Sequence, residues 1–220
     1  MKRYSHFLFD LDGTLTNPKE GITKCVQYAL RSFGIEEPDL DKLEPFIGPP
    51  LVDSFMEYYG MTREQAKEAT EKYRERFRDI GIFENEVFPG VPRMLETLQS
   101  QGKRLVVASS KPEEYVERIL DRFGIRRFFC EVVGASMDET RSAKADVIRE
   151  AFRRLHITEE QKDGILMIGD RKHDVEGAKA CGIDCLGVYV GFAPPGELEQ
   201  AKATYIADTV EEMSRFLQAH

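Results

Sequence analysis

The chain has 220 residues, of which 41% are apolar, and its 31 basic and 39 acidic residues give a net charge of −8. This length and apolar content predict one globular domain, or one domain with an insert. No apolar run reaches about 18 residues, so no membrane span is predicted. An acidic chain without a block of basic residues is not expected to bind nucleic acid. Residues 1–6 lead straight into the first predicted strand and leave no room for a signal peptide, so a cytoplasmic location is expected.

The stretch from Phe7 to Leu15 combines a short apolar run with two carboxylates spaced two residues apart, Asp10 and Asp12. The apolar run predicts a buried strand, and Gly13 with Thr14 marks the turn that follows it. Because alternate residues of a strand point to the same side, the two carboxylates are expected to converge above the sheet. Two close carboxylates are unfavourable unless a metal ion or a proton is held between them.

The segment from residue 17 to residue 85 is expected to be an all-helical block. A helix is predicted from Asn17 at the N-cap to Gly34, and a short polar helix over residues 39–43. Another helix is predicted from Leu51 to Gly60. Thr62 and Gln65 form a capping-box pattern that opens a long helix, with Ile80 on its apolar face and Gly81 at its end.

From residue 86 onward, short apolar segments alternate with amphipathic ones. Strands are predicted over residues 104–108, 128–133, 165–168, 183–190 and 204–207, and helices over 91–98, 112–123, 143–155, 175–180 and 210–217. This alternation predicts an α/β fold with a doubly wound parallel sheet. The domain boundaries that follow are a core of residues 1–16 and 86–220, interrupted by a helical insert of residues 17–85.

Polar clusters follow three further predicted segments. Ser109 and Ser110 follow a strand, Lys144 opens a helix, and the string Gly169-Asp170-x-x-x-Asp174 follows another strand. In doubly wound folds, ligands bind at the carboxyl ends of strands near a topological switch point. The four-residue spacing of Asp170 and Asp174 places both carboxylates on one face if the chain is helical there.

In this order and context, the four clusters resemble the four motifs of the haloacid dehalogenase-like hydrolase superfamily. The resemblance implies that Asp10 is a nucleophile that forms an aspartyl-phosphate and that Asp12 is the general acid and base. It further implies that Ser109, Ser110 and Lys144 bind the phosphoryl group, with Lys111 as a rival for the cationic role.

The same resemblance implies a metal site. The expected ligands are carboxylate oxygens of Asp10 and Asp170 and the backbone carbonyl of Asp12, with Asp174 acting through a bound water or through Lys144. An oxygen-only, largely hydrated set of this kind suits Mg²⁺.

The insert resembles the helical C1 cap of the phosphoglycolate phosphatase-like branch, and its loop with Phe46 and Ile47 is expected to select the substrate. The implied function is Mg²⁺-dependent hydrolysis of a small phosphorylated metabolite by a monomer or weak homodimer, without nucleic-acid or membrane partners.

Several alternatives stay open from the sequence. A 5′-nucleotidase-like activity is one, and a β-phosphoglucomutase-like sugar phosphomutase, which shares every core motif, is another. A phosphate-binding pseudo-enzyme is the non-catalytic alternative. Response-regulator receivers also combine carboxylates, a hydroxyl and a lysine, but their paired acids and acceptor aspartate lie on different strands and they lack a helical insert.

Overall fold

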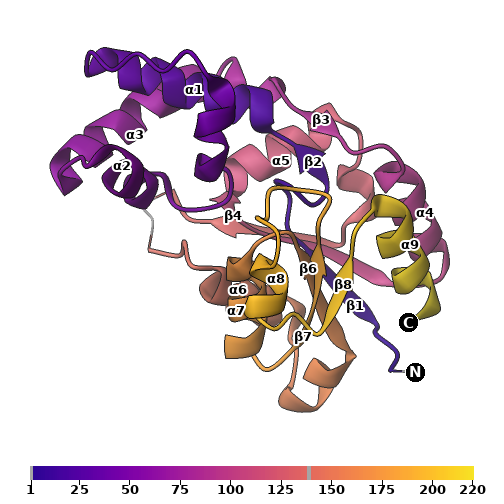
Figure 1. Cartoon of the computed structure of the whole chain (residues 1–220). Helices are drawn as coiled ribbons and strands as arrows, with labels where there is room; N and C mark the ends of the chain where they lie inside the picture. Colours follow the sequence, from indigo (N-terminus) through magenta and orange to yellow (C-terminus); the bar gives the residue numbers. More distant parts are fainter. Residues whose placement is uncertain (1, 138–139) are drawn as a thin grey trace. The chain divides into compact units, whose positions relative to one another are not determined.

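A computed structural model describes residues 2–137 and 140–220 and divides into two compact units, Met1–Thr16 with Val87–His220, and Asn17–Glu86 (Figure 1). Where the chain passes between the units, two short strands, β2 (Thr16–Asn17) and β3 (Glu86–Val87), pair with each other. These strands were not predicted, because two residues are too few to show an alternating pattern.

The first unit contains a six-stranded sheet in the order β5-β4-β1-β6-β7-β8, with parallel pairing throughout. Its strands are β1 (His6–Phe9), β4 (Arg104–Pro112), β5 (Glu131–Ala135), β6 (Ile165–Gly169), β7 (Asp184–Val188) and β8 (Tyr205–Ala207). The predicted doubly wound parallel sheet is confirmed.

Strand β1 lies at the centre of this sheet, between β4 and β6. Phe9 is in register with Val107 on one side and with Ile168 on the other. The chain first adds strands outward on the β4 side and then returns to add β6, β7 and β8 on the opposite side. The strand order therefore reverses between β1 and β6, which is where such folds bind ligands.

Helices and 3-10 segments connect these strands. They are α4 (Val91–Ser100), α5 (Glu113–Arg122), η3 (Arg126–Phe128), α6 (Lys144–Leu155), η4 (Glu159–Gly164), α7 (Lys172–Ala180), α8 (Glu197–Gln200) and α9 (Val210–Ala219). Leu8 of β1 belongs to a buried core with Val147 of α6 and Val175 of α7. Phe9 points to the opposite face of the sheet, where the centroid of its ring lies 6.3 Å from the centroid of the Phe129 ring. Helices α4 and α9 lie side by side.

Some predicted boundaries are wrong by a few residues. Strand β5 begins at Glu131 rather than at Phe128, which ends the 3-10 segment η3. Phe128 is nevertheless buried. The apolar pattern of residues 128–133 therefore predicted the burial of Phe128 correctly but its strand conformation wrongly. Strand β4 continues past Ala108 to Pro112, with an irregularity in its pairing with β5, and β7 ends at Val188.

The second unit is helical, as predicted. It contains α1 (Lys19–Ser32), η1 (Leu40–Phe46), α2 (Leu51–Tyr59), α3 (Arg63–Phe77) and η2 (Gly81–Phe83). The predicted capping box of Thr62 and Gln65 is confirmed at the start of α3.

Two details of the second unit differ from expectation. Pro18, not Asn17, is the N-cap of α1, although Asn17 Oδ1 accepts a hydrogen bond from Lys19 N. Ile80 is 54% exposed, because α3 ends at Phe77 and no longer directs it inward.

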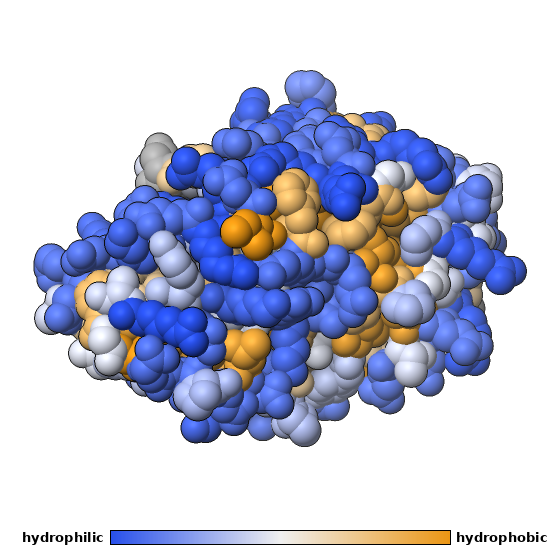
Figure 2. Space-filling model, turned by 90° about the horizontal axis from the view of Figure 1, so that it is seen from above, coloured by the Kyte–Doolittle hydropathy of each residue, from blue (hydrophilic) through white to orange (hydrophobic). Residues whose placement is uncertain are grey.

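Hydrophilic residues cover most of the face in view in Figure 2, with smaller apolar patches between them. Within residues 2–137 and 140–220, no helix has the length and apolar character needed to cross a membrane.

Candidate active site

Asp10 directly follows β1 and is held in the sheet by its backbone N–H, which donates to the carbonyl of Ile168 at 2.9 Å. Its carboxylate is fixed at both oxygens. Oδ1 accepts a hydrogen bond from Leu11 N at 2.7 Å, and Oδ2 lies 3.0 Å from the ammonium nitrogen of Lys144. The predicted nucleophile is therefore a buried carboxylate with a defined orientation.

Lys144 is the first residue of α6, and its side chain is only 3% exposed. The ammonium lies between Asp10 and Asp174, 2.8 Å from Oδ1 of Asp174, and donates to the carbonyl of Ala108 at 3.0 Å. Burial alone would lower the pKa of the Lys144 ammonium, but the charges of Asp10 and Asp174 outweigh burial and raise this pKa. Lys144 is thus a permanent cation at the centre of the cluster.

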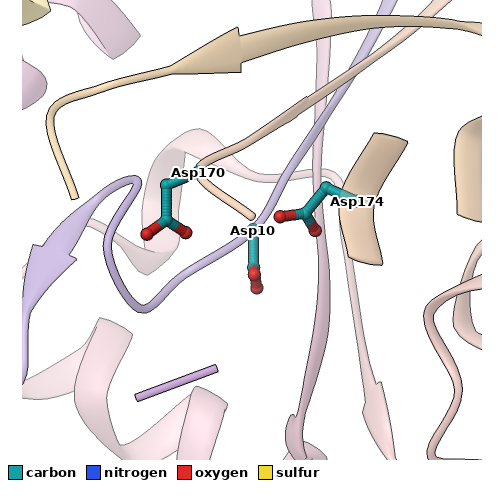
Figure 3. A group of neighbouring side chains, drawn as sticks. All are labelled: Asp10, Asp170 and Asp174. Atoms are coloured by element: carbon teal, nitrogen blue, oxygen red, sulfur yellow. The ribbon is translucent and has the colours of Figure 1, made fainter. Parts of the chain in front are cut away.

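Asp170 and Asp174 bring two more carboxylates to Asp10, and ligand atoms of all three lie within 4.8 Å of one another (Figure 3). Oδ2 of Asp170 accepts a hydrogen bond from Phe192 N at 2.8 Å, and Oδ2 of Asp174 accepts one from Arg171 N at 3.1 Å. Burial raises the pKa of Asp170 well above its ordinary range, and the charge of Asp174 adds to this shift. Burial also raises the pKa of Asp174, to about 6, against the opposing effect of Lys144.

The environment of these carboxylates fits a divalent cation. Oδ1 of Asp170 is buried and accepts no hydrogen bond from any described residue. A buried anion that lacks a partner is costly, and burial, with the charges of the neighbouring carboxylates, raises the pKa values of Asp170 and Asp174. As predicted from the resemblance, Asp10 and Asp170 would hold the cation. Asp10 and Asp174 both also lie next to Lys144. The donors are all oxygens, the set that Mg²⁺ prefers.

Two glycines make the close packing around Asp170 possible. A Cβ atom on Gly13 would lie 2.1 Å from Oδ2 of Asp170, and a Cβ atom on Gly191 would lie 2.2 Å from the same oxygen. Gly13 also has a φ of +77°, a backbone conformation that residues other than glycine rarely adopt. At these two positions, therefore, only glycine lets the backbone approach the Asp170 carboxylate this closely without a clash.

Asp12 is not part of the cluster of three carboxylates and has its own cation. Oδ2 of Asp12 lies 2.5 Å from the ammonium nitrogen of Lys111, and the two side chains are 11% and 8% exposed. Burial raises the pKa of Asp12, and Lys111 acts in the opposite direction. The two candidate lysines thus have different positions, with Lys144 beside Asp10 and Lys111 beside Asp12.

The remaining predicted residues lie in two places. Ser109 is buried near the end of β4, and its Oγ accepts a hydrogen bond from Lys111 N at 3.3 Å, while Ser110 is partly exposed. Phe46 and Ile47 are buried in the second unit, where the ring of Phe46 lies 4.9 Å from that of Phe55. Their roles in phosphoryl binding and in substrate choice stay predictions.

Sequence reasoning missed the segment after β7 that contacts Asp170. Phe192 supplies the backbone donor described above, and Gly191 supplies the close approach. A glycine directly after an apolar strand was the available signal, because such a position allows a tight backbone approach to a site.

Known proteins resemble this chain along most of its length. Residues 7–188 match the family model described as haloacid dehalogenase-like hydrolase. A protein of Pseudomonas aeruginosa named 5′-nucleotidase is 44% identical over 218 residues, which cover 99% of this chain and 97% of that protein. Tyrosine-protein kinase PtkA of Mycobacterium tuberculosis is 36% identical, over 96% of this chain and 71% of that protein.

Among solved structures, a predicted phosphatase from Clostridium acetobutylicum superposes with a TM-score of 0.94 and is 44% identical. The superposition covers 99% of this chain and 100% of that one. The match to the family model extends from β1 to the end of β7 and so includes all four predicted motifs. On these grounds, the chain belongs to the haloacid dehalogenase-like hydrolase family.

Proposed function

We propose that this chain is a Mg²⁺-dependent phosphatase that hydrolyses phosphate monoesters of small metabolites through an aspartyl-phosphate at Asp10. The observation that carries the proposal is the position of Lys144, whose ammonium lies within 3.0 Å of both Asp10 and Asp174. A buried carboxylate that is oriented by a cation, with a second acid two residues away, is equipped for nucleophilic catalysis. Family membership supports the same reaction class.

In the first step, a carboxylate oxygen of Asp10 attacks phosphorus and the bond from phosphorus to the ester oxygen breaks. The departing oxygen takes a proton from the carboxylic acid of Asp12, so the leaving group departs as an alcohol. The raised pKa of Asp12, which burial causes, favours the protonated form that this step needs. Lys144 and the hydroxyl of Ser109 would stabilise the negative charge on the phosphoryl oxygens.

In the second step, a water molecule attacks the phosphorus of the aspartyl-phosphate and gives its proton to the carboxylate of Asp12. The bond from phosphorus to the Asp10 oxygen breaks, inorganic phosphate is released, and both aspartates return to their starting states. Asp12 thus serves first as an acid and then as a base.

Asp10, Asp170 and the backbone carbonyl of Asp12 would hold Mg²⁺. When bound, this ion would supply positive charge that lowers the repulsion between the carboxylates and the phosphoryl oxygens. The buried Oδ1 of Asp170, which has no hydrogen-bond donor among the described residues, supports the proposal of a cation there.

For the substrate, a nucleoside 5′-monophosphate is the first choice, because the 44% identical relative is named a 5′-nucleotidase. Phosphoglycolate is the second, from the resemblance of the helical insert to that branch. We assign the choice between them to the second unit, at Phe46 and Ile47. Because Phe46 is buried against Phe55, the test variant is Phe46→Leu with Phe55→Leu as its control, and only Phe46→Leu should alter the ratio of kcat/KM values for the two esters.

The test of the function is release of phosphate from both esters, with Mg²⁺ and with excess EDTA. Wild type should release phosphate only with the metal, and Asp10→Asn should release none while remaining folded. Release that is unchanged by EDTA or by Asp10→Asn would overturn the proposal. Conversion of a sugar 1-phosphate into its 6-phosphate would indicate a mutase, and transfer of phosphate from ATP to a tyrosine peptide would indicate a kinase.

A further inference from the structure

The segment between β7 and α8, residues 189–196, contacts the loop that carries Asp170, although it lies about twenty residues further along the chain. Phe192 N donates to Oδ2 of Asp170 at 2.8 Å. Gly191 approaches so closely that a Cβ atom would lie 2.2 Å from both Oδ2 of Asp170 and the carbonyl oxygen of Gly13. The position of the Asp170 carboxylate therefore depends on the path of this segment.

Glu197 follows this segment and makes further contacts with the Asp170 loop. Its Oε1 accepts hydrogen bonds from Arg171 Nε at 2.9 Å and from Lys172 N at 2.8 Å, and its Oε2 lies 3.4 Å from Nη2 of Arg171. The carboxylate of Glu197 is 13% exposed, and the Arg171 side chain is 11% exposed. Charge-assisted hydrogen bonds of this kind, shielded from water, are among the stronger ones in proteins.

These contacts fix the backbone on the C-terminal side of Asp170. Arg171 is the N-cap of α7, and its own N–H donates to Asp174, so Asp174 and Glu197 together accept two consecutive N–H groups where α7 begins. Such N–H groups have no partner inside the helix. With Glu197 on one side and Phe192 on the other, the Asp170 carboxylate has little freedom to turn away from Asp10.

The segment itself is anchored at its base. The hydroxyl of Tyr189 accepts a hydrogen bond from Gly196 N at 2.9 Å and donates to Glu199. The segment is therefore closed into a loop before Glu197, and Glu197 joins this closed loop to the start of α7.

We infer that Glu197 is a positioning residue for the metal-binding carboxylate of Asp170, acting through Arg171 and Lys172 without contacting the metal. The inference rests on the metal site of the proposed function and adds to it a residue that lies outside all four motifs. Residues that orient metal ligands in this way typically affect metal affinity about 10–100-fold when they are replaced.

The experiment measures Mg²⁺ binding to the whole protein by isothermal titration calorimetry, without substrate. Wild type is compared with Glu197→Gln, which keeps an acceptor for Lys172 N but loses the ion pair with Arg171, and with Glu197→Ala, which loses both. The control is Glu176→Gln, because Glu176 also lies on α7 and carries the same charge, but its side chain is 63% exposed. Asp170→Asn defines the loss of the site.

The expected result is a rise in Kd of about tenfold for Glu197→Gln and a larger rise for Glu197→Ala, with Glu176→Gln close to wild type. The kcat of Glu197→Gln should recover at saturating Mg²⁺. Equal Kd values for Glu197→Gln and Glu176→Gln would overturn the inference. A Glu197→Gln variant that melts at a lower temperature than wild type in EDTA, but binds Mg²⁺ with the wild-type Kd, would also overturn it, because Glu197 would then only support the fold. If wild type binds no Mg²⁺, or if Asp170→Asn binds Mg²⁺ as well as wild type does, the proposed metal site is wrong and the inference fails with it. If Mg²⁺ binds as expected but no phosphate is released, only the proposed reaction is contradicted.

Discussion

The ammonium of Lys111 lies 2.5 Å from the carboxylate of Asp12, and both groups are buried. Asp12, the proposed general acid and base, is therefore oriented by Lys111, whereas the proposed nucleophile Asp10 lies beside a different cation, Lys144. Removing one partner of a buried ion pair leaves the other charge uncompensated and free to turn.

The first prediction is that Lys111→Met lowers kcat by about 100-fold, as expected when a reacting group is misplaced by about 1 Å. The Mg²⁺ Kd should not change, because the carboxylate that Lys111 pairs with, that of Asp12, is not one of the three clustered carboxylates. Steady-state kinetics and calorimetry measure the two quantities. Lys103→Met is the control, since Lys103 is a partly buried lysine that donates to the carbonyl of Tyr4, before β1. A similar loss in both variants would mean that Lys111 only supports the fold.

The second prediction concerns Gly177 of α7, which packs against Lys144. A Cβ atom on Gly177 would lie 2.7 Å from Cγ and 2.9 Å from Cβ of Lys144. Replacing glycine by alanine in a helix interior usually stabilises a protein by about 1 kcal/mol, whereas overpacking costs about 1–3 kcal/mol.

We therefore expect Gly177→Ala to lower both the free energy of unfolding and the kcat, because the added methyl group displaces Lys144 from Asp10. Urea denaturation and phosphate release test this together. Glu176→Ala in the same helix controls for helix propensity alone. A more stable Gly177→Ala enzyme with full activity would show that the Lys144 side chain adapts without loss.

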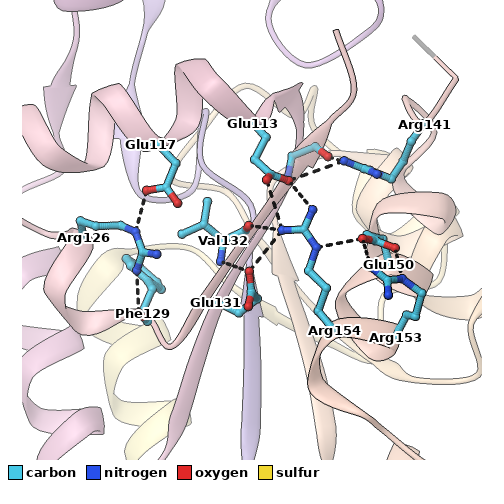
Figure 4. A network of polar contacts seen from close by, with 11 residues as sticks. Glu113, Glu117, Arg126, Phe129, Glu131, Val132, Arg141, Glu150, Arg153 and Arg154 are labelled. Atoms are coloured by element: carbon cyan, nitrogen blue, oxygen red, sulfur yellow. Dashed lines mark hydrogen bonds and ion pairs between the residues drawn. The ribbon is translucent and has the colours of Figure 1, made fainter. Parts of the chain in front are cut away.

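The third prediction concerns Arg154, which joins α6 to the start of α5 and to β5 (Figure 4). Its guanidinium lies 2.9 Å from Glu113 and 3.2 Å from Glu131, and it donates to the carbonyl of Val132 at 3.1 Å. Glu113 also accepts a hydrogen bond from Gly134 N at 3.1 Å. Because Arg154 and Glu113 belong to one network of polar contacts, the effects of replacing these two residues on stability should be coupled.

A double-mutant cycle with Glu113→Gln and Arg154→Met should give a coupling of about 0.5–3 kcal/mol in the free energy of unfolding. The exposed pair of Asp146 and Arg149, on the same helix, should give about 0.2–1 kcal/mol. Equal couplings for the two pairs would contradict the importance of the network.

The fourth prediction is a pH dependence that arises from Glu150. Hydrogen bonds from Arg153 and Arg154 lower the pKa of Glu150 from an ordinary 4.5 to about 2. Because the folded-state pKa is the lower one, the stabilisation is fully present above pH 4.5 and is lost as the pH falls toward 2.

Wild type should therefore exceed Glu150→Gln in free energy of unfolding by a constant amount above about pH 5.5, and this difference should shrink steadily below pH 4.5. Urea titrations at several pH values between 3 and 7 measure it. A difference that does not vary with pH would show that the Glu150 charge contributes nothing to stability.

The sequence predicted the sheet and the chemical groups at its carboxyl edge because those signals are local. Asp10 and Asp170 each follow an apolar run directly, and the strand ends place them without any knowledge of distant contacts. The position of β5 was misjudged because Phe128 is buried in a 3-10 turn, and burial does not distinguish a turn from a strand.

The contacts between distant segments were beyond prediction from local patterns. The ion pair of Lys111 and Asp12 depends on the pairing of β4 with β1 and on the irregular end of β4, which no local pattern encodes. The contact of Glu197 with Arg171 depends on the path of the segment after β7. The sequence suggested Lys111 only as a rival for the cation that binds the phosphoryl group, and Glu197 carries no sequence signal that differs from that of an ordinary surface residue.

The measurement that tests the central claim most directly is the mass of the peptide containing Asp10 after acid quenching during turnover of a nucleoside 5′-monophosphate with Mg²⁺. The account predicts that this peptide gains the mass of one phosphoryl group, and that fragmentation assigns the group to Asp10. Asp12→Asn should still show the adduct when a substrate with a good leaving group is used, and Asp10→Asn should show none. Phosphate release by wild type, with no adduct at Asp10 at any quench time or with the adduct on another residue, would contradict the account.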